Sequence, residues 1–157
     1  MTGCTESGMA VVQRALDETI EKLLPTVESL MQTLAPNEVV ACESEDDGFA
    51  FTAPLRFPDG IGTGTVVAKL FRYRERVRFD VELAHNRVFA RPDGTKSDRR
   101  CFMNDFVAST SFDAGTETIS TDFHRYVVSG VHAAREAVQR HNRQQMAPWN
   151  RVSVASR

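Results

Sequence analysis

Cysteine is scarce in this sequence, and long hydrophobic runs are missing from it. The three cysteines are Cys4, Cys42 and Cys101, and their odd number and wide spacing favour neither a disulfide framework nor a zinc site. No apolar run approaches the roughly 20 residues needed to span a bilayer, so we expect no membrane segment. The chain opens without the basic and apolar regions of a secretory leader. Together these absences predict a cytoplasmic protein with free thiols.

The composition is that of an ordinary folded domain. Of 157 residues, 41% are hydrophobic and 25% are charged, which excludes a disordered or collagen-like chain. A chain of this length buries roughly 68–70% of its unfolded surface, enough for a core without disulfides or a structural metal. We predict a single domain over residues 1–145. The segment 146–157 contains Pro148, Trp149 and several polar residues, and we expect it to be an irregular tail.

Charge is distributed unevenly along the chain. Residues 1–60 contain eleven acidic and three basic side chains, a net charge of −8, whereas residues 61–157 contain ten acidic and sixteen basic side chains, a net charge of +6. Such halves attract each other within one fold or across a dimer, or they present differently charged faces to partners. The overall charge of −2 lacks the positive excess of a dedicated nucleic-acid-binding protein.

Two segments have the apolar spacing of amphipathic helices. The first spans about 8–34, and its apolar residues recur at steps of three or four. Pro25 interrupts this pattern, so we expect a kink or break near 21–24. The second helix is predicted from about 122 to 144, with Thr121 or Asp122 as its N-cap. The stripe of the first helix consists of Val12, Leu16, Ile20, Leu23, Val27, Leu30 and Leu34.

Between the helices the apolar residues alternate, which is typical of half-buried strands. Asp-Gly pairs at 47–48, 59–60 and 93–94 punctuate the region and favour tight hairpin turns. The segment 99–120 fits either a short helix or a hairpin, and we favour the hairpin. The fold class predicted is therefore α+β, an antiparallel meander of about five to seven strands with the N-terminal and C-terminal helices packed on one face. The predicted strands are 38–44, 48–57, 63–72, 76–84, 86–91, 105–112 and a short strand ending at 118–119.

The segment 69–78 is the most distinctive local feature, because four arginines surround a tyrosine within it. In a hairpin, alternation places two of these arginines on the face opposite Val77 and Phe79. Guanidinium groups beside an aromatic ring suit an acidic protein surface, and they also suit phosphates and bases. An alternative is a solvated strand face whose arginines pair with acidic residues of the same chain. The candidate binding residues are Arg72, Tyr73, Arg74, Arg76 and Arg78.

No other motif predicts a catalytic, metal or cofactor site. The glycines at 60, 62 and 64 precede an apparent strand, whereas a phosphate loop needs a helix there. Cys101, Asp122 and His124 are the only trio that we consider as a cysteine nucleophile with its base. The more common interpretation of such a cysteine is a small buried core residue. The four histidines lack the spacing of a chelating pair, and we expect them to be partly exposed. The acidic run at 43–47 lacks the offsets of an EF-hand loop.

These observations favour a non-enzymatic protein-binding module, such as an adaptor, chaperone or inhibitor of a larger partner. The alternative is a nucleic-acid-binding protein that uses the arginine-rich hairpin 69–78. A small enzyme or a ligand-binding pocket between sheet and helices is the third hypothesis. The long stripe of the first helix also suits self-association, so a homodimer formed through a terminal helix is a further prediction.

Overall fold

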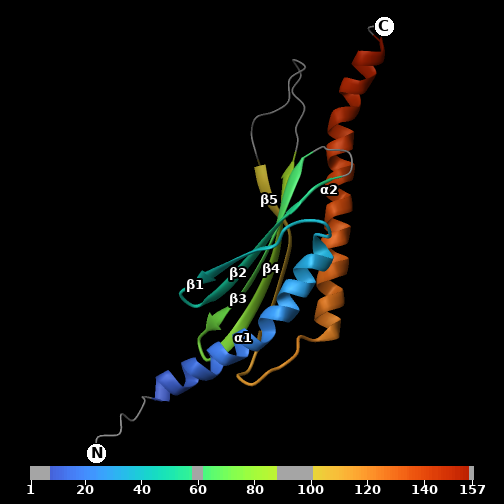
Figure 1. Cartoon of the computed structure of the whole chain (residues 1–157). Coiled ribbons are helices and arrows are strands. Elements are labelled where there is room, and N and C mark those ends of the chain that lie inside the picture. Colours follow the sequence, from blue (N-terminus) through green and yellow to red (C-terminus); the bar gives the residue numbers. More distant parts are fainter. Residues whose placement is uncertain (1–7, 58–61, 88–100, 156–157) are drawn as a thin grey trace, which may run out of the picture.

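A computed structural model describes residues 8–57, 62–87 and 101–155 of the chain, with side-chain detail for 8–57, 62–85 and 105–145. One five-stranded antiparallel sheet, ordered β1-β2-β3-β4-β5, lies between two long helices in the sequence. Figure 1 shows both helices against the sheet, α1 crossing it obliquely and α2 running along it. The α+β prediction is therefore confirmed. The elements are α1 (Gly8–Leu34), β1 (Ala41–Glu45), β2 (Gly48–Leu55), β3 (Thr63–Tyr73), β4 (Arg76–Arg87), β5 (Cys101–Phe112) and α2 (Thr121–Ala155).

Helix α1 buries the predicted apolar stripe against the sheet. Every stripe residue from Leu16 to Leu34 is buried, whereas Val12 remains 40% exposed. The helix is continuous through Pro25, so of the kink or break expected near 21–24 the break does not occur. Pro25 is exposed, and burial of the residues on either side of it offsets the one hydrogen bond that proline removes.

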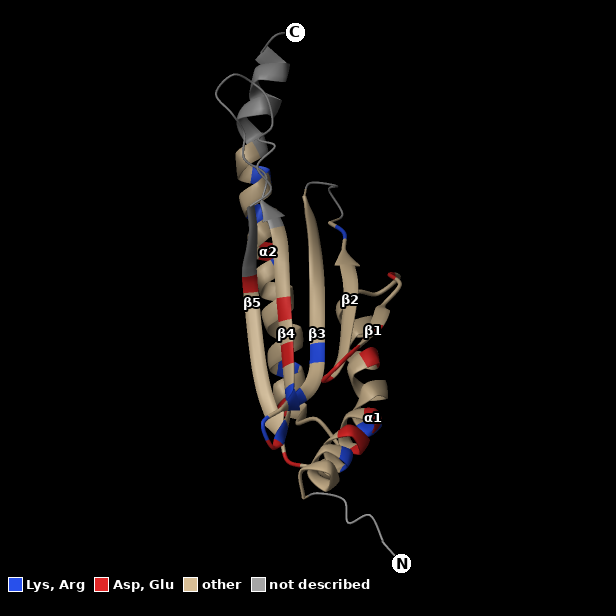
Figure 2. Cartoon of the chain, turned by 90° about the vertical axis from the view of Figure 1, so that its left-hand side faces the viewer, with Lys and Arg blue, Asp and Glu red and all other residues tan. Residues whose placement is uncertain are grey.

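The sheet has one covered face and one open face. Leu70, Phe79 and Val81 are fully buried on the covered face, and they pack with the α1 stripe in one hydrophobic core. Helix α2 adds Val127 and Val131 to the same core. Both helices thus pack on one face, and the alternation of the strands leaves Lys69, Arg78 and other polar residues on the opposite face, which is turned toward the viewer in Figure 2.

The boundaries of several elements differ from those expected. β4 runs without a break from Arg76 to Arg87, so the strands expected at 76–84 and 86–91 are not separated at residue 85. Residues 88–91 of the second expected strand lie outside the described part of the chain. β5 is a strand, as the hairpin interpretation predicts, but the short strand expected near 118–119 does not form. Helix α2 continues to Ala155, so the expected irregular tail is helical as far as that residue. Each residue added to an existing helix gains one backbone hydrogen bond, so a helix can continue past the end of its apolar pattern. The pattern therefore determines the C-terminal end of α2 only weakly.

The segment between β5 and α2 is a turn fastened to α1. The Gly115 amide donates to the Thr19 hydroxyl over 2.9 Å, and that hydroxyl donates to the Ala15 carbonyl over 2.8 Å. Gly115 has a φ of 92°, which glycine adopts without strain. These bonds bind the turn to the helix, which explains why 114–119 does not extend the sheet.

Candidate functional site

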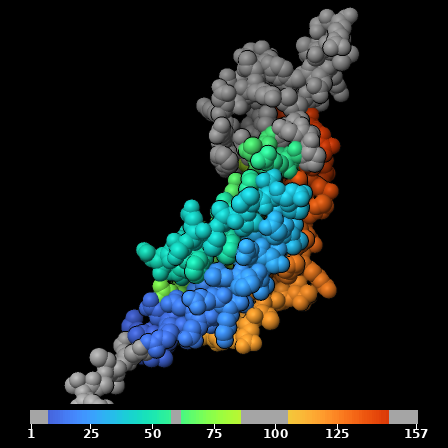
Figure 3. Space-filling model, viewed as in Figure 1, coloured from blue at the N-terminus to red at the C-terminus, as the bar shows by residue number. Residues whose placement is uncertain are grey.

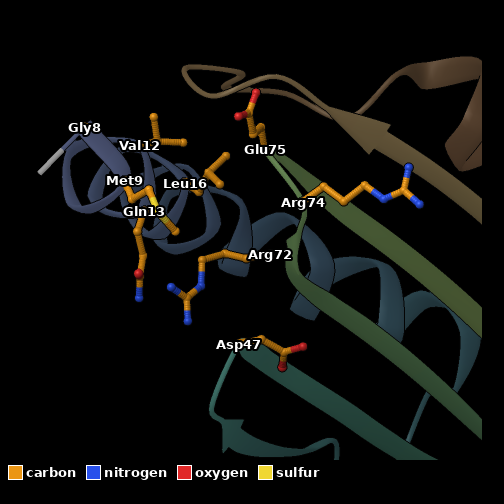
Figure 4. A pocket seen from close by; sticks show the side chains of 9 residues that line it. All are labelled: Gly8, Met9, Val12, Gln13, Leu16, Asp47, Arg72, Arg74 and Glu75. Carbon is orange, nitrogen blue, oxygen red and sulfur yellow. The ribbon is translucent and has the colours of Figure 1, made fainter.

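A groove of about 530 Å3 lies between the first turns of α1 and the tips of two hairpins. Met9, Val12 and Leu16, spaced three and four residues apart, form its apolar side. The β1-β2 and β3-β4 turns contribute charged residues of both signs, and Figure 4 shows these turns facing the helix across the groove. Met9 is 84% exposed and Val12 is 40% exposed, so this end of α1 extends past the sheet that buries the rest of its apolar side. The charged residues that line the groove are Asp47, Arg72, Arg74 and Glu75.

Arg72 joins the three elements that form the groove. Its Nε lies 3.2 Å from an oxygen of Asp17 on α1, and its Nη2 donates to the Asp46 carbonyl in the β1-β2 turn over 2.8 Å. The backbone amide of Arg72 donates to the Asp47 carbonyl over 2.7 Å. The side chain is 20% exposed. Arg72 therefore holds the site together, and its guanidinium is engaged within the chain.

Tyr73 stands between two guanidinium groups at the end of the β3-β4 hairpin. Arg74 and Arg78 lie over its ring, 5.3 and 5.2 Å from the centroid. Phe71 meets the same ring edge-on at 6.4 Å. Such cation-π contacts hold long side chains in place. The cluster faces solvent, because Tyr73 is 45% exposed.

The turn that carries this cluster has two residues, since Tyr73 pairs with Arg76 across it. Two-residue hairpin loops usually require positive φ at their first position, and Arg74 has a φ of 58°. This backbone conformation, together with the stacking on Tyr73, directs the Arg74 side chain away from α1 (Figure 4).

The remaining arginines of the hairpin pair with acidic residues of the chain. Arg76 lies 3.1 Å from Asp113, and both side chains are at least half exposed. Arg78 donates to Asp80 over 2.9 Å, and this hydrogen bond, followed by the charge of Asp80, raises the pKa of the guanidinium. Within the described residues, only Arg74 of the four arginines has no acidic partner. The predicted binding residues are thus brought together, but three of the four arginines already pair with carboxylates of the chain.

The sequence patterns do not identify the groove residues on α1 as a site. The predicted stripe begins at Val12 and does not include Met9, which lies three residues before it. The available signal is the three-and-four spacing, which continues from Leu16 through Val12 to Met9 but does not show where the sheet ends. Neighbouring β1 is exposed along its whole length, and Figure 3 shows this end of the sheet protruding beside α1.

The other sequence motifs do not assemble into sites. Cys101 begins β5, whereas Asp122 and His124 lie in the first turn of α2, beyond the opposite end of that strand. Thr63, which follows Gly62, begins β3, so the glycine run does not precede a helix. The acidic residues at 43–47 are exposed in β1 and its turn. No group of three metal-binding side chains occurs among the residues that the structure describes.

One histidine departs from the expectation of partial exposure. His85 is fully buried, and its Nδ1 lies 2.9 Å from an oxygen of Asp105, whose side chain is 5% exposed. Phe57 stacks on the imidazole ring at 5.1 Å. A Cβ on Gly64 would stand 2.9 Å from this ring, so glycine makes room for it. The bulge in the β4-β5 ladder beside Leu83 accompanies this polar pair in the core.

Comparison of the chain with family models, with curated proteins and with solved structures found no match. Neither helix, over its described length, combines the length and apolar character needed to cross a membrane.

Proposed function

We propose that this chain is a non-enzymatic protein-binding module, an adaptor, chaperone or inhibitor that docks a larger protein partner in the groove beside α1. The observation that carries the proposal is the exposed apolar end of α1, with Met9 and Val12 facing a groove bordered by charged turns. Apolar contact area within a polar rim is the usual composition of a protein interface. Arginine is enriched in such interfaces, and Arg72 and Arg74 line this groove.

The charge of the hairpin favours a protein over a nucleic acid. Phosphate binding requires cationic groups that release counterions from the nucleic acid. Arg72, Arg76 and Arg78 already face carboxylates of their own chain, which leaves Arg74 as the one available guanidinium of the described hairpin. The Arg74 side chain points away from α1 (Figure 4), so it suits an acidic residue that lies outside the apolar segment bound beside α1. We therefore propose a partner segment that combines apolar and acidic side chains.

Selection from a random peptide display library tests this proposal, because it does not require the partner to be identified first. We expect enrichment of peptides that contain apolar and acidic residues together. Binding of a selected peptide should fall at least tenfold in Val12→Asp, because a charge would enter the apolar side of the groove. Val39→Asp is the matched control, since Val39 is 85% exposed outside the groove. Equal losses in both variants, or no enriched peptide, would contradict the proposal.

A nucleic-acid arm addresses the alternative function directly. Random DNA and RNA are titrated against the wild-type chain over a range of salt concentrations. We expect no binding near micromolar at physiological salt. Binding that weakens steeply with salt and disappears in Arg74→Gln, with Arg125→Gln as the matched control, would replace the protein-binding proposal with the nucleic-acid one.

A further inference from the structure

The two edges of the sheet differ in their protection against pairing with another strand. β1 has five residues, two of them glutamates, and short or charged edge strands resist pairing. β5 has twelve residues, and its segment 106–112 contains no charged residue, proline or glycine. Figure 2 shows β5 as the outermost strand of the sheet, without charge from the single red segment to its lower end. The bulge and the inward-pointing Asp105 precede this segment, and from residue 106 to 112 the edge has no charge or proline that would prevent association.

Apolar side chains flank the β5 edge on both faces of the sheet. Val107 is 53% exposed on the open face, and Tyr126 of α2 is 58% exposed on the covered side. The Tyr126 ring lies 5.6 Å from that of Phe106. A Cβ on Gly130 would overlap the Phe106 ring, so α2 approaches this strand closely. The edge therefore offers both backbone hydrogen-bonding groups and exposed apolar surface.

We propose that a second copy of this chain pairs with β5, antiparallel and across a two-fold axis through Ser109, to form a continuous ten-stranded sheet. This register places Phe106 opposite Phe112 of the second copy and Val107 opposite its Ser111. In each pair, both residue numbers are even or both are odd. Every side chain therefore lies on the same face of the joined sheet as its partner. The uncharged segment 106–112 then faces itself without opposing like charges.

The aromatic residues support the same register. Phe112 is half-buried against the core, and two-fold pairing brings it beside Phe106 and Tyr126 of the other copy. Two equivalent aromatic clusters result, one on each side of the axis. The groove beside α1 contains no residue of β5 or α2, so a dimer formed in this way leaves both grooves accessible, and the two proposals are independent.

Paired charge substitutions test both the association and its register. Sedimentation velocity of the wild-type chain should give twice the 17.5 kDa chain mass. In the proposed dimer, Val107→Lys combined with Ser111→Lys places a lysine of one copy opposite a lysine of the other at each 107–111 pair. This variant should therefore be monomeric, with half the measured mass. Val107→Lys combined with Ser111→Glu opposes unlike charges and should restore the dimer. Thr52→Lys combined with Thr63→Lys, exposed positions on β2 and β3, is the matched control and should remain dimeric.

A crosslink gives a second measurement that does not depend on these variants. Ser109→Cys, with the three native cysteines changed to serine, should form an intermolecular disulfide on oxidation, because residues paired directly across antiparallel strands lie within bridging distance. Ser111→Cys should not, since this position lies opposite Val107. A wild-type monomer at high concentration would overturn the proposal. A dimer that persists with opposed lysines, or that crosslinks at 111 and not at 109, would assign the interface to another surface or register.

Discussion

The covered and open faces of the sheet belong to the same strands but differ in how their side chains interact. On the covered face of β4, Val77, Phe79 and Val81 are fully buried. On the open face of the same strand, Arg76 and Arg78 form ion pairs at or near the surface. Burial contributes to stability in proportion to apolar area, whereas exposed ion pairs contribute at most about 1 kcal/mol. The covered face therefore determines the fold, whereas the ion pairs of the open face contribute little to its stability.

The largest expected effect comes from comparing two phenylalanines on opposite faces. Phe79→Ala removes a fully buried ring and should lower the free energy of unfolding by about 3–5 kcal/mol. Phe71→Ala removes a half-buried ring on the open face and should cost less than half as much. Urea denaturation of both variants measures the difference. Similar losses would mean that the open face is covered in solution.

A smaller effect is expected at Gly48, where β2 begins. A Cβ at this position would overlap the carbonyl oxygen of Leu70 in β3, and a backbone atom within a ladder cannot move aside without breaking hydrogen bonds. Gly48→Ala should therefore destabilise the chain by about 1–3 kcal/mol. Gly8→Ala is the control, because nothing lies near its Cβ. A neutral Gly48→Ala would show that β2 and β3 pair in another register.

Two arginines of the same hairpin should differ in their effect on stability. Arg72→Gln removes contacts to both α1 and the β1-β2 turn and should cost about 1–2 kcal/mol. Arg76→Gln removes an exposed pair with Asp113 and should cost under about 0.5 kcal/mol. Thermal unfolding of the two variants distinguishes them. Equal losses would contradict the structural role assigned to Arg72.

The smallest effect concerns reactivity. Cys42 on β1 is a free thiol, and partial burial, followed by the charge of Glu28, raises its pKa. Less thiolate is then present at a given pH, so alkylation of Cys42 should be slower than that of an unstructured cysteine. Its rate should rise at higher pH than usual, and Glu28→Gln should shift this rise downward. Peptide mass spectrometry after timed iodoacetamide treatment measures both effects.

Local patterns predicted the covered face well and the site only in part. The stripe from Leu16 to Leu34 and the alternation around Phe79 follow from periodicities of 3.6 and 2.0 residues. The partners of Arg72 are 26 and 55 residues away, in the β1-β2 turn and on α1, and no local pattern shows such pairings. The exposure of Val12 likewise depends on where the sheet ends. The burial of His85 with Asp105 depends on the β4-β5 register and on the space left by Gly64.

The most direct test of the central claim measures how salt affects binding by the arginine hairpin. Wild type and a variant combining Arg74→Gln, Arg76→Gln and Arg78→Gln, which retains Arg72, are titrated with a selected peptide and with random RNA. If the hairpin binds protein, the wild type should bind the peptide, and the ionic-strength dependence of this binding should be weaker in the variant. The wild type should show no RNA binding that the variant could lose. Near-micromolar RNA binding by the wild type at physiological salt, with a salt slope that falls by about one for each arginine removed, would contradict the account.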